Sequence, residues 1–175
     1  MQFTDIVAKF GKPLAIDQQE HVFRQGDANR NFYIVQNGLL KAYYLTEDGK
    51  EYIKSFLMPG DVIGSLSAMR GKEGCSFNLV SLKPCKLVKV SFEKVFDATL
   101  DDPQLGRLIT DFLITFGMKK EKREYELLCL SAEERYRQLL ANQPELFKAV
   151  QQSDIALYLG VTPVGLSRIK QRVGS

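Results

Sequence analysis

Residues 22–64 read VFRQGDANRNFYIVQNGLLKAYYLTEDGKEYIKSFLMPGDVIG. Short runs of β-branched and aromatic residues alternate here with turn-forming glycine, asparagine and aspartate, and the pattern continues to residue 91. Such runs at near-regular spacing are typical of a β-sandwich or barrel and not of alternating strands and helices. The predicted strands are residues 21–24, 31–36, 39–45, 52–58, 76–82 and 86–91. Residues 1–19 are predicted to form a short amphipathic start.

Beyond Phe92 the sequence becomes helical. A helix is predicted to begin at Pro103, because proline suits a first helical turn and Asp101 or Asp102 can cap it. Apolar residues then recur every three or four positions and form one seam. These residues are Leu105, Ile109, Phe112 and Phe116. Because a charged stretch follows, we expect this seam to pair with the same helix of a second chain. Packing on the chain's own β-domain is the alternative.

Capping patterns mark the helices that follow. Ser131, with Glu134 three residues later, is a capping box that begins a helix over residues 130–140, and Pro144 ends it. Ser153 is predicted to cap a further short helix, and Gly160 to supply the left-handed position at its end.

A second helix of the C-terminal segment follows closely. Thr162 is its predicted cap and Pro163 its first residue. The side chains predicted to face inward are Leu166, Ile169 and Val173. The two short helices and their tight turn form a predicted helix–turn–helix.

The outward face of the second helix suits the major groove of DNA, because its N-terminal end is small and neutral and cations follow. Arg168 can reach guanine O6 and N7 in bidentate fashion, while Lys170 and Arg172 would attract phosphates regardless of sequence. The helix N-terminus at Thr162 can donate to a phosphate. The candidate DNA-binding residues are Gln152, Ser153, Thr162, Pro163, Val164, Ser167, Arg168, Lys170 and Arg172. A packed helical hairpin with solvated charges is the alternative.

The composition is that of an ordinary globular protein. The 175 residues are 45% hydrophobic and 26% charged, with a formal net charge of +3. These values exclude disorder, a collagenous fibre and a disulfide scaffold, and they neither indicate nor exclude nucleic-acid binding. His21 is the only histidine, so we expect no histidine-based metal site, no catalytic triad and no enzyme. A cupin-type metalloenzyme would need several histidines.

Cysteine usage and hydropathy suggest a location. Cys75, Cys85 and Cys129 are odd in number and form no CxxC pair, so we expect a reducing, cytoplasmic compartment and no zinc or iron–sulfur site. No window of about 18 residues is apolar and uncharged, and the start, MQFTDIVAKF, lacks a long apolar core and a cleavage site. We therefore expect neither a membrane span nor a secretory signal.

The order of β-rich domain, long helix and C-terminal helix–turn–helix resembles the Crp/Fnr (catabolite activator) family of bacterial transcription regulators. Landmarks of its cyclic-nucleotide-binding-type jelly roll are Gly26-Asp27, Tyr33-Ile34-Val35, Gly38 and Pro59-Gly60-Asp61-Val62-Ile63-Gly64. The resemblance implies an α+β fold in three parts. These are an N-terminal double-stranded β-helix (jelly roll) in residues 1–100, a dimerisation helix in 101–130 and a helix–turn–helix DNA-binding domain in 131–175.

The resemblance also implies partners. A homodimer would bind a near-palindromic site on double-stranded DNA, and an unidentified small-molecule effector in the jelly roll would reorient the recognition helices. RNA polymerase is a further candidate partner. The alternative is a ligand-binding or protein-interaction module of the same fold without sequence-specific DNA binding, which Pro163, Val164 and the modest charge favour. Family members usually continue into a β-hairpin wing, whereas this sequence ends at Ser175, so either the lineage ends early or the sequence is a truncation. A missing wing would weaken contacts to the DNA backbone.

The pocket departs from the family pattern. Cyclic-nucleotide binders of the family carry Phe-Gly-Glu-Leu and then Arg-Ser/Thr-Ala, whose glutamate holds the ribose and whose arginine neutralises the cyclic phosphate. Here Ser65 replaces the glutamate, Cys75 the arginine and Phe77 the alanine. We therefore expect no cyclic-AMP binding of the usual kind and no cofactor. The expected degenerate pocket comprises Gly64, Ser65, Leu66, Ser67, Cys75, Ser76, Lys120 and Glu121, the last two at the family's base-contacting positions. A thiol sensor at Cys75 is the alternative to a plain packing role.

Overall fold

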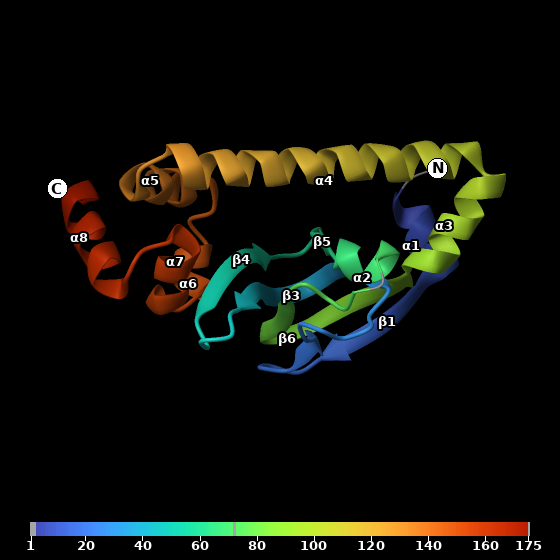
Figure 1. Ribbon diagram of the computed structural model, residues 1–175, viewed down its shortest axis with the longest axis horizontal. Helices are drawn as coiled ribbons and strands as arrows, with labels where there is room; N and C mark the ends of the chain where they lie inside the picture. The colour runs from blue at the N-terminus through green and yellow to red at the C-terminus, as the bar shows by residue number, and fades with distance from the viewer. Residues whose placement is uncertain (1–2, 72, 175) are drawn as a thin grey trace. The chain divides into compact units, whose positions relative to one another are not determined.

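The chain forms two compact units. The computed structural model describes residues 3–71 and 73–174 (Figure 1). The first unit is Met1–Phe112 and the second is Leu113–Ser175. Their boundary falls inside one long helix, α4 (Pro103–Cys129). The sequence predicted three parts, with the long helix as a part of its own. Because α4 is divided between the two units, this division stays a prediction.

An antiparallel β-sheet of jelly-roll-like form makes up most of the first unit. Within the described residues the strand order is β1-β6-β3-β4, with β2 paired to β6 and β5 paired to β3 (Figure 1). Every one of these pairings is antiparallel. The strands are β1 (Gly11–Ile16), β2 (His21–Phe23), β3 (Asn31–Leu45), β4 (Glu51–Leu57), β5 (Val62–Ile63) and β6 (Asn78–Ser91). The predicted jelly-roll-like β-domain with additional helices is confirmed.

Strands β3 and β6 are longer than predicted, because each continues through residues that the sequence pattern indicates as a break between two strands. β3 runs through Asn37-Gly38 and β6 runs through Pro84. The β3–β6 register shifts on both sides of Asn37, so the chain passes this point as an irregularity within the ladder. Gly38 has a φ of +101°, and a Cβ there would lie 2.5 Å from the Cys85 Sγ. Glycine is therefore required where the two strands approach.

The predicted amphipathic start contains both a helix and a strand. Helix α1 spans Phe3–Phe10, and β1 follows it directly. Strand β1 was not predicted from the sequence; it lies at one end of the strand order and carries Pro13. An edge strand tolerates proline because one side of it makes no ladder hydrogen bonds, and so its sequence signal is weak.

Buried apolar side chains form two clusters in the first unit. Neighbouring residues along β3 alternate between them, with Tyr33 in one cluster and Phe32 in the other. Since successive side chains of a strand point to opposite faces, the clusters lie on opposite faces of the sheet. Ile6 of α1 and Val95 of α3 (Phe92–Asp101) belong to the second cluster. Helix α2 (Leu66–Arg70) lies between β5 and β6 in the chain.

Helix caps predicted from the sequence are confirmed at two places. The Asp102 Oδ1 accepts hydrogen bonds from the backbone N–H groups of Gln104 and Leu105, at 3.0 and 3.1 Å, at the start of α4. Ser131 and Glu134 form the expected capping box of α5 (Ala132–Asn142). The Glu134 N–H donates to the Ser131 Oγ at 3.2 Å, and the Ser131 N–H donates to the Glu134 Oε2 at 2.7 Å.

The predicted dimer seam of α4 is partly buried in the chain's own first unit. Leu105 is 1% exposed and packs in the second cluster of its own unit. This burial favours the alternative, in which the seam packs on the chain's own β-domain, at Leu105. Ile109 packs beside the same cluster, and Phe112 and Phe116 are half-buried. Their place in an interface stays a prediction.

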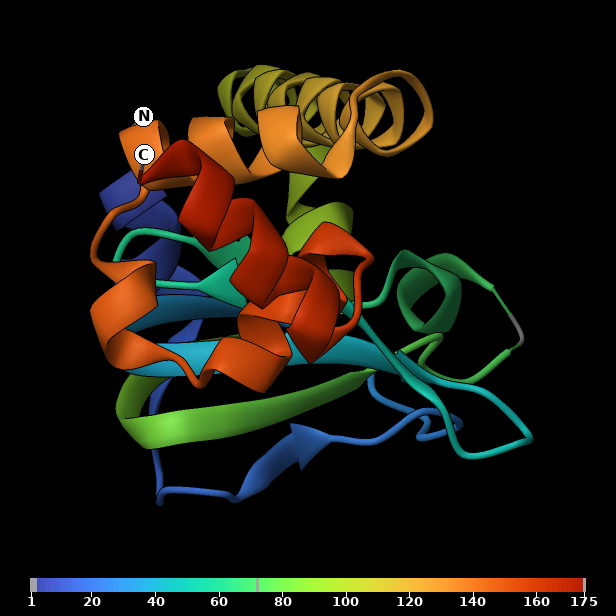
Figure 2. The same ribbon diagram turned by 90° about the vertical axis from the view of Figure 1, so that its left-hand side faces the viewer.

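The second unit contains the end of α4 and the helices that follow it (Figure 2). In its described part these are α5, α6 (Leu146–Ala149), α7 (Gln152–Leu159) and α8 (Pro163–Val173). α8 contacts both α7 and α5, and α5 contacts α7. The buried side chains of this helical core are Tyr136, Leu139, Leu146, Val150, Ile155, Ala156, Leu159, Leu166 and Ile169. Among the described residues, none of the helices combines the length and apolar character that a membrane crossing needs.

Candidate nucleic-acid interface and sensor pocket

The turn between α7 and α8 has the geometry that its residues predict. Gly160 has φ +70° and ψ 32°, and its N–H and that of Val161 donate to carbonyls of the last turn of α7. Thr162 caps α8, since its Oγ1 accepts a hydrogen bond from the Gly165 N–H at 3.1 Å, and Pro163 follows as the first helical residue. The left-handed glycine and the cap together turn the chain from one helix into the next within three residues.

The N-terminal cap of α7 is not the predicted one. Helix α7 begins at Gln152, and the Ile155 N–H donates to the Gln151 carbonyl at 3.1 Å, so Gln151 is the cap residue. Ser153 therefore lies inside the first turn, where its hydroxyl cannot cap the helix. Gln152 and Ser153 are both exposed.

Side chains of α8 divide between the core and solvent. Leu166 and Ile169 are 2% and 4% exposed, as predicted, and Val173 is half-buried. The candidate DNA-binding residues of this helix lie on its exposed side. They are Pro163, Val164, Ser167, Arg168, Lys170 and Arg172. One helix therefore presents a small, neutral end followed by three cations.

The three cations of α8 differ in their surroundings. The Lys170 Nζ donates to the Gln152 Oε1 at 3.0 Å, and the Arg172 Nε lies 3.1 Å from the Glu133 Oε2. Among the residues that the structure describes, Arg168 has no hydrogen-bond or ion-pair partner. The Arg168 guanidinium can therefore use all its N–H donors to bind another molecule. Lys170 and Arg172 must first break their contacts with Gln152 and Glu133.

Serine hydroxyls dominate the predicted pocket in the first unit. Ser65 is 1% exposed, and its Oγ accepts a hydrogen bond from the Ser76 N–H at 3.1 Å. The Oγ atoms of Ser65 and Ser67 lie 2.9 Å apart, and the Ser67 Oγ donates to the Gly74 carbonyl at 3.2 Å. These polar groups satisfy one another. Of the other expected pocket residues here, Leu66 is exposed and Gly64 is half-buried.

Cys75 stands at the position where the family's cyclic-nucleotide binders carry an arginine. The Cys75 thiol is 2% exposed, and burial raises its pKa, so the side chain is neutral. The Phe77 ring lies 5.3 Å from that of Phe23, so it occupies the cluster beside the thiol. Cys75 therefore cannot supply the charge-assisted hydrogen bonds that an arginine at this position would give to a cyclic phosphate. The residues present do not fit a cyclic nucleotide held in the usual way. A neutral, buried thiol also makes a poor redox sensor.

The remaining pocket residues belong to the second unit. Lys120 and Glu121 lie on α4, where the Lys120 Nζ is 4.9 Å from the centre of the Phe116 ring. Their contribution to a pocket stays a prediction.

His21 has polar neighbours within its own β-domain. Its Nε2 lies 3.0 Å from the Tyr43 hydroxyl, and burial and the nearby Arg24 lower its pKa. Among the described residues, no group of three or more potential metal ligands occurs.

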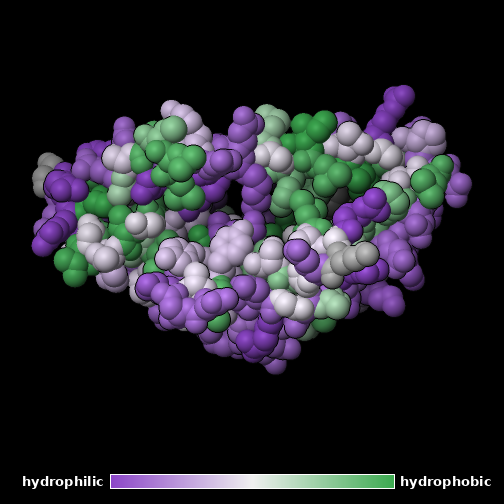
Figure 3. Space-filling view, in the orientation of Figure 1, coloured by the Kyte–Doolittle hydropathy of each residue, from purple (hydrophilic) through white to green (hydrophobic). Residues whose placement is uncertain are grey.

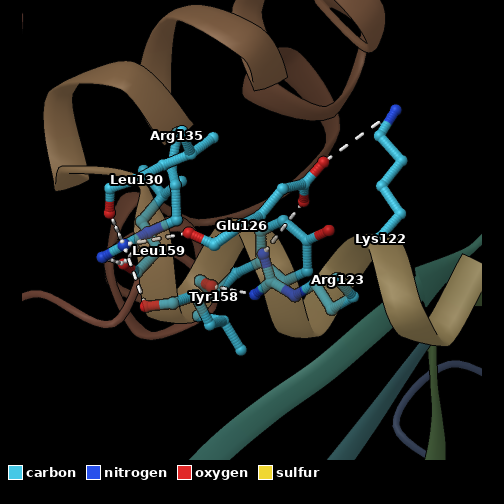
Figure 4. Close-up of polar contacts among 8 residues, drawn as sticks. Lys122, Arg123, Glu126, Leu130, Arg135, Tyr158 and Leu159 are labelled. Atoms are coloured by element: carbon cyan, nitrogen blue, oxygen red, sulfur yellow. Dashed lines mark hydrogen bonds and ion pairs between the residues drawn. The ribbon is translucent and has the colours of Figure 1, made fainter.

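Two arginines that the sequence analysis missed lie at the end of α4 and the start of α5. The Arg123 and Arg135 guanidinium groups donate to backbone carbonyls of α7, and Arg135 also donates to carbonyls at the end of α4 (Figure 4). A signal did exist for Arg135, because a cation one turn into α5 is close to the C-terminal carbonyls of the preceding helix.

Comparisons with known proteins define the class first. The family described as "Cyclic nucleotide-binding domain" matches residues 13–102, which is just over half of the chain. The first unit is thus a domain of the cyclic-nucleotide-binding class.

Similar proteins then give the family. The transcriptional activator protein Anr of Pseudomonas protegens is 29% identical over 98% of this chain and 73% of Anr. The nitrogen fixation regulation protein FixK of Azorhizobium caulinodans is 26% identical over 93% of this chain and 69% of FixK. The solved structure of FixK2 from Bradyrhizobium japonicum shares the fold, with a TM-score of 0.79 at 20% identity over 94% of this chain and 84% of FixK2. The chain belongs to the Crp/Fnr family.

Proposed function

We propose that this chain is a dimeric, sequence-specific DNA-binding transcription regulator of the Crp/Fnr type. The observation that carries the proposal is the C-terminal helical pair, α7 and α8, which buries one side of α8 and presents Arg168 to solvent without a partner among the described residues. Relatives named as transcriptional activators or regulators, such as Anr and FixK, support it. Such a regulator would act in the cytoplasm, and its effect on transcription would pass through RNA polymerase. We propose no catalytic activity.

In this proposal α8 enters the major groove as a recognition helix. Its N-terminal end approaches the DNA, with Thr162 and the first backbone N–H groups near a phosphate and with Pro163 and Val164 against base edges. Arg168 donates in bidentate fashion to guanine O6 and N7, and Lys170 and Arg172 contact phosphates. Phosphate contacts set the position of the helix, while Arg168 supplies the choice of base.

The dimer would form along α4. Hydrophobic residues gather over this helix in the space-filling view (Figure 3). Its most exposed apolar side chains in the second unit include Ile114 at 57%, Met118 at 63%, Tyr125 at 58% and Leu128 at 76%. These four are four, seven and three residues apart, so they share one face of the helix. Ile109, Phe112 and Phe116 lie on the opposite face, and the proposed interface leaves them out. Pairing this stripe with the same stripe of a second chain would remove it from water and place two copies of α8 about a two-fold axis.

The residues of the pocket bear on the chemistry of the effector. Because Ser65, Ser67 and Ser76 satisfy one another and Cys75 is a neutral thiol, we propose that a cyclic nucleotide is not the signal. If the β-domain takes another small molecule, that molecule must bind one arrangement of the dimer more tightly than the other in order to change DNA affinity.

Selection from a random-sequence duplex library with the purified chain tests the proposal. We expect enrichment of an inverted repeat, an affinity that falls steeply with salt, and no change on adding 3′,5′-cyclic AMP. Failure to enrich any duplex would instead support a ligand-binding or protein-interaction module of the same fold. Enrichment that requires cyclic AMP would overturn the assignment of the pocket as degenerate.

A further inference from the structure

Two arginines join the end of α4 to the end of α7 within the second unit. Figure 4 shows Arg123 on α4 and Arg135 on α5, both directed at the carbonyl end of α7, where Tyr158 and Leu159 precede the turn into α8. Neither residue belongs to the candidate DNA-binding surface or to the pocket. Their function must lie in the arrangement of the helices themselves.

Arg135 contacts two helix ends with one guanidinium group. Its Nε and Nη2 donate to the Leu159 carbonyl at 3.2 and 2.9 Å, and its Nη1 donates to the Leu130 carbonyl. The same Nη1 lies 3.4 Å from the Glu126 carbonyl. The last carbonyls of a helix have no partner within it and carry partial negative charge, so a cation here is favourable at both ends.

Arg123 contacts the same end of α7 through Tyr158. Its Nη2 donates to the Tyr158 carbonyl, and its guanidinium carbon lies 3.9 Å from the centre of the Tyr158 ring. The carboxylate of Glu126 lies 3.9 Å from the Arg123 Nη1 and fixes the side chain along α4. Burial and the positive charge of Arg123 lower the pKa of Arg135, an unfavourable effect that Glu126 partly offsets.

Planar guanidinium groups fix direction as well as distance. Arginine presents its donors in a rigid fork, so bonds from one group to two helix ends constrain the angle between them. The carbonyl of Leu159 is one residue before Gly160, which begins the turn into α8. The two arginines and the short turn therefore couple the orientation of α8 to that of the end of α4.

We propose that Arg135 and Arg123 are positioning residues that set the direction of α8 relative to α4, and hence the spacing of the two DNA half-sites that a dimer accepts. The inference rests on the proposed function, in which α4 forms the dimer and α8 enters the groove. Two recognition helices fixed on one dimer fit half-sites at one separation only. Loosening the contact between α4 and α7 lets each α8 pivot, so the separation that the dimer accepts becomes less strict.

Library selection with charge-preserving variants tests the inference. Arg135→Lys and Arg123→Lys keep the positive charge and remove the fork, whereas Arg137→Lys is a matched control on α5, where Arg137 pairs with Glu133 on the exposed surface. For each protein we would determine the preferred half-site and the spread of spacer lengths. Affinities for the best spacer and for spacers one and two base pairs longer or shorter would then be compared.

The wild-type chain and Arg137→Lys should select one spacer length. Arg135→Lys and Arg123→Lys should select the same half-site with a broader range of spacers. The affinity ratio between the best and the altered spacers should fall by about tenfold, the size expected when a charge-assisted hydrogen bond is lost. This ratio is independent of the fraction of folded protein, so a loss of stability alone leaves it unchanged.

The results distinguish failure of the proposed function from failure of the positioning role. If the wild-type chain enriches no duplex, the proposed function fails. If it enriches an inverted repeat and both variants keep the wild-type spacer preference, only the positioning role is overturned. Variants that do not fold as dimers also overturn it, because the arginines would then be needed for folding and not for direction.

Discussion

In the proposed function, base recognition depends on Arg168. Its side chain is exposed on α8, and within the described part of the chain it has no partner to give up when DNA arrives. We expect Arg168→Ala to remove about 1–3 kcal/mol of discrimination at one base pair of each half-site, the usual size for a bidentate arginine–guanine contact. Competition binding with guanine-substituted duplexes measures this loss, and sedimentation should show an unchanged dimer. Unaltered discrimination would assign base reading to another residue.

Cysteine reactivity provides a second test at this scale. Cys75 and Cys85 are 2% and 3% exposed, and burial raises the pKa of both thiols, while Cys129 is exposed. We expect iodoacetamide to modify Cys129 in the native protein and to reach the other two only after unfolding, as mass spectrometry of the labelled peptides can show. Rapid modification of Cys75 by iodoacetamide in the native protein would support the thiol-sensor hypothesis instead.

The same pKa shifts predict how stability depends on pH. A thiol whose pKa is raised by folding binds its proton more tightly in the native state. Above the ordinary thiol pKa, near about 8.5, the unfolded chain therefore holds fewer protons, and the free energy of unfolding falls as pH rises. Urea unfolding of the wild type and of Cys75→Ser at pH 7 and pH 9.5 would measure the effect, and the variant should lose part of the pH dependence.

At the scale of elements, the turn between α7 and α8 depends on backbone conformation. Gly160 has a positive φ, and a Cβ there would meet only the Arg135 Nη2, at 3.8 Å, so a larger residue is opposed by the backbone and not by crowding. We expect Gly160→Ala to lower the free energy of unfolding by about 1 kcal/mol, and Gly160→Asn to cost less because asparagine tolerates this conformation.

Gly106→Ala is the control of opposite sign. Gly106 lies inside α4 without a positive φ, and a Cβ there would have ordinary contacts with Thr99. Replacing a helical glycine by alanine should raise the free energy of unfolding by roughly 0.5–1 kcal/mol. Equal destabilisation by Gly160→Ala and Gly106→Ala would contradict the assignment of the turn.

Local signals predicted the caps of α4, α5 and α8 correctly, because a capping side chain and its backbone partner are at most three residues apart. The β-sheet was predicted less well. The breaks inside β3 and β6 are set by pairing between distant strands, and β1 is defined by its place beside β6. For the same reason the periodicity of α4 predicted an apolar seam at Leu105 but not which chain covers it.

In the candidate site, too, features set by nearby residues were predictable and features set by distant residues were not. Exposed residues of α8 follow from helical periodicity, and so they were predictable. Arg123 and Arg135 donate to the carbonyls of Tyr158 and Leu159, which lie 35 and 24 residues away in sequence. The local signal for Arg135 indicates only its contact with the end of α4, and not these distant contacts. The expected loss of a cyclic-nucleotide site stays a prediction, and it rests only on Ser65 and Cys75 at two recognisable positions.

For the whole molecule, the proposed dimer depends on the apolar stripe of α4 defined by Ile114, Met118, Tyr125 and Leu128. A carboxylate buried in that interface would have no partner and would oppose association. We expect Met118→Glu to convert the dimer into monomers in analytical ultracentrifugation and to weaken DNA binding, while Lys119→Glu on a different face of the helix leaves the dimer intact. A dimer that survives both changes would place the interface elsewhere.

The central claim is that two copies of α8 contact one duplex from a symmetric pair of chains. Hydroxyl-radical footprinting of the wild-type chain on its selected duplex tests this most directly. The account predicts two protected patches on one face of the DNA, centred roughly 34–36 Å apart, and their joint loss with Arg168→Ala. A single patch, or protection that Arg168→Ala leaves unchanged, would contradict it.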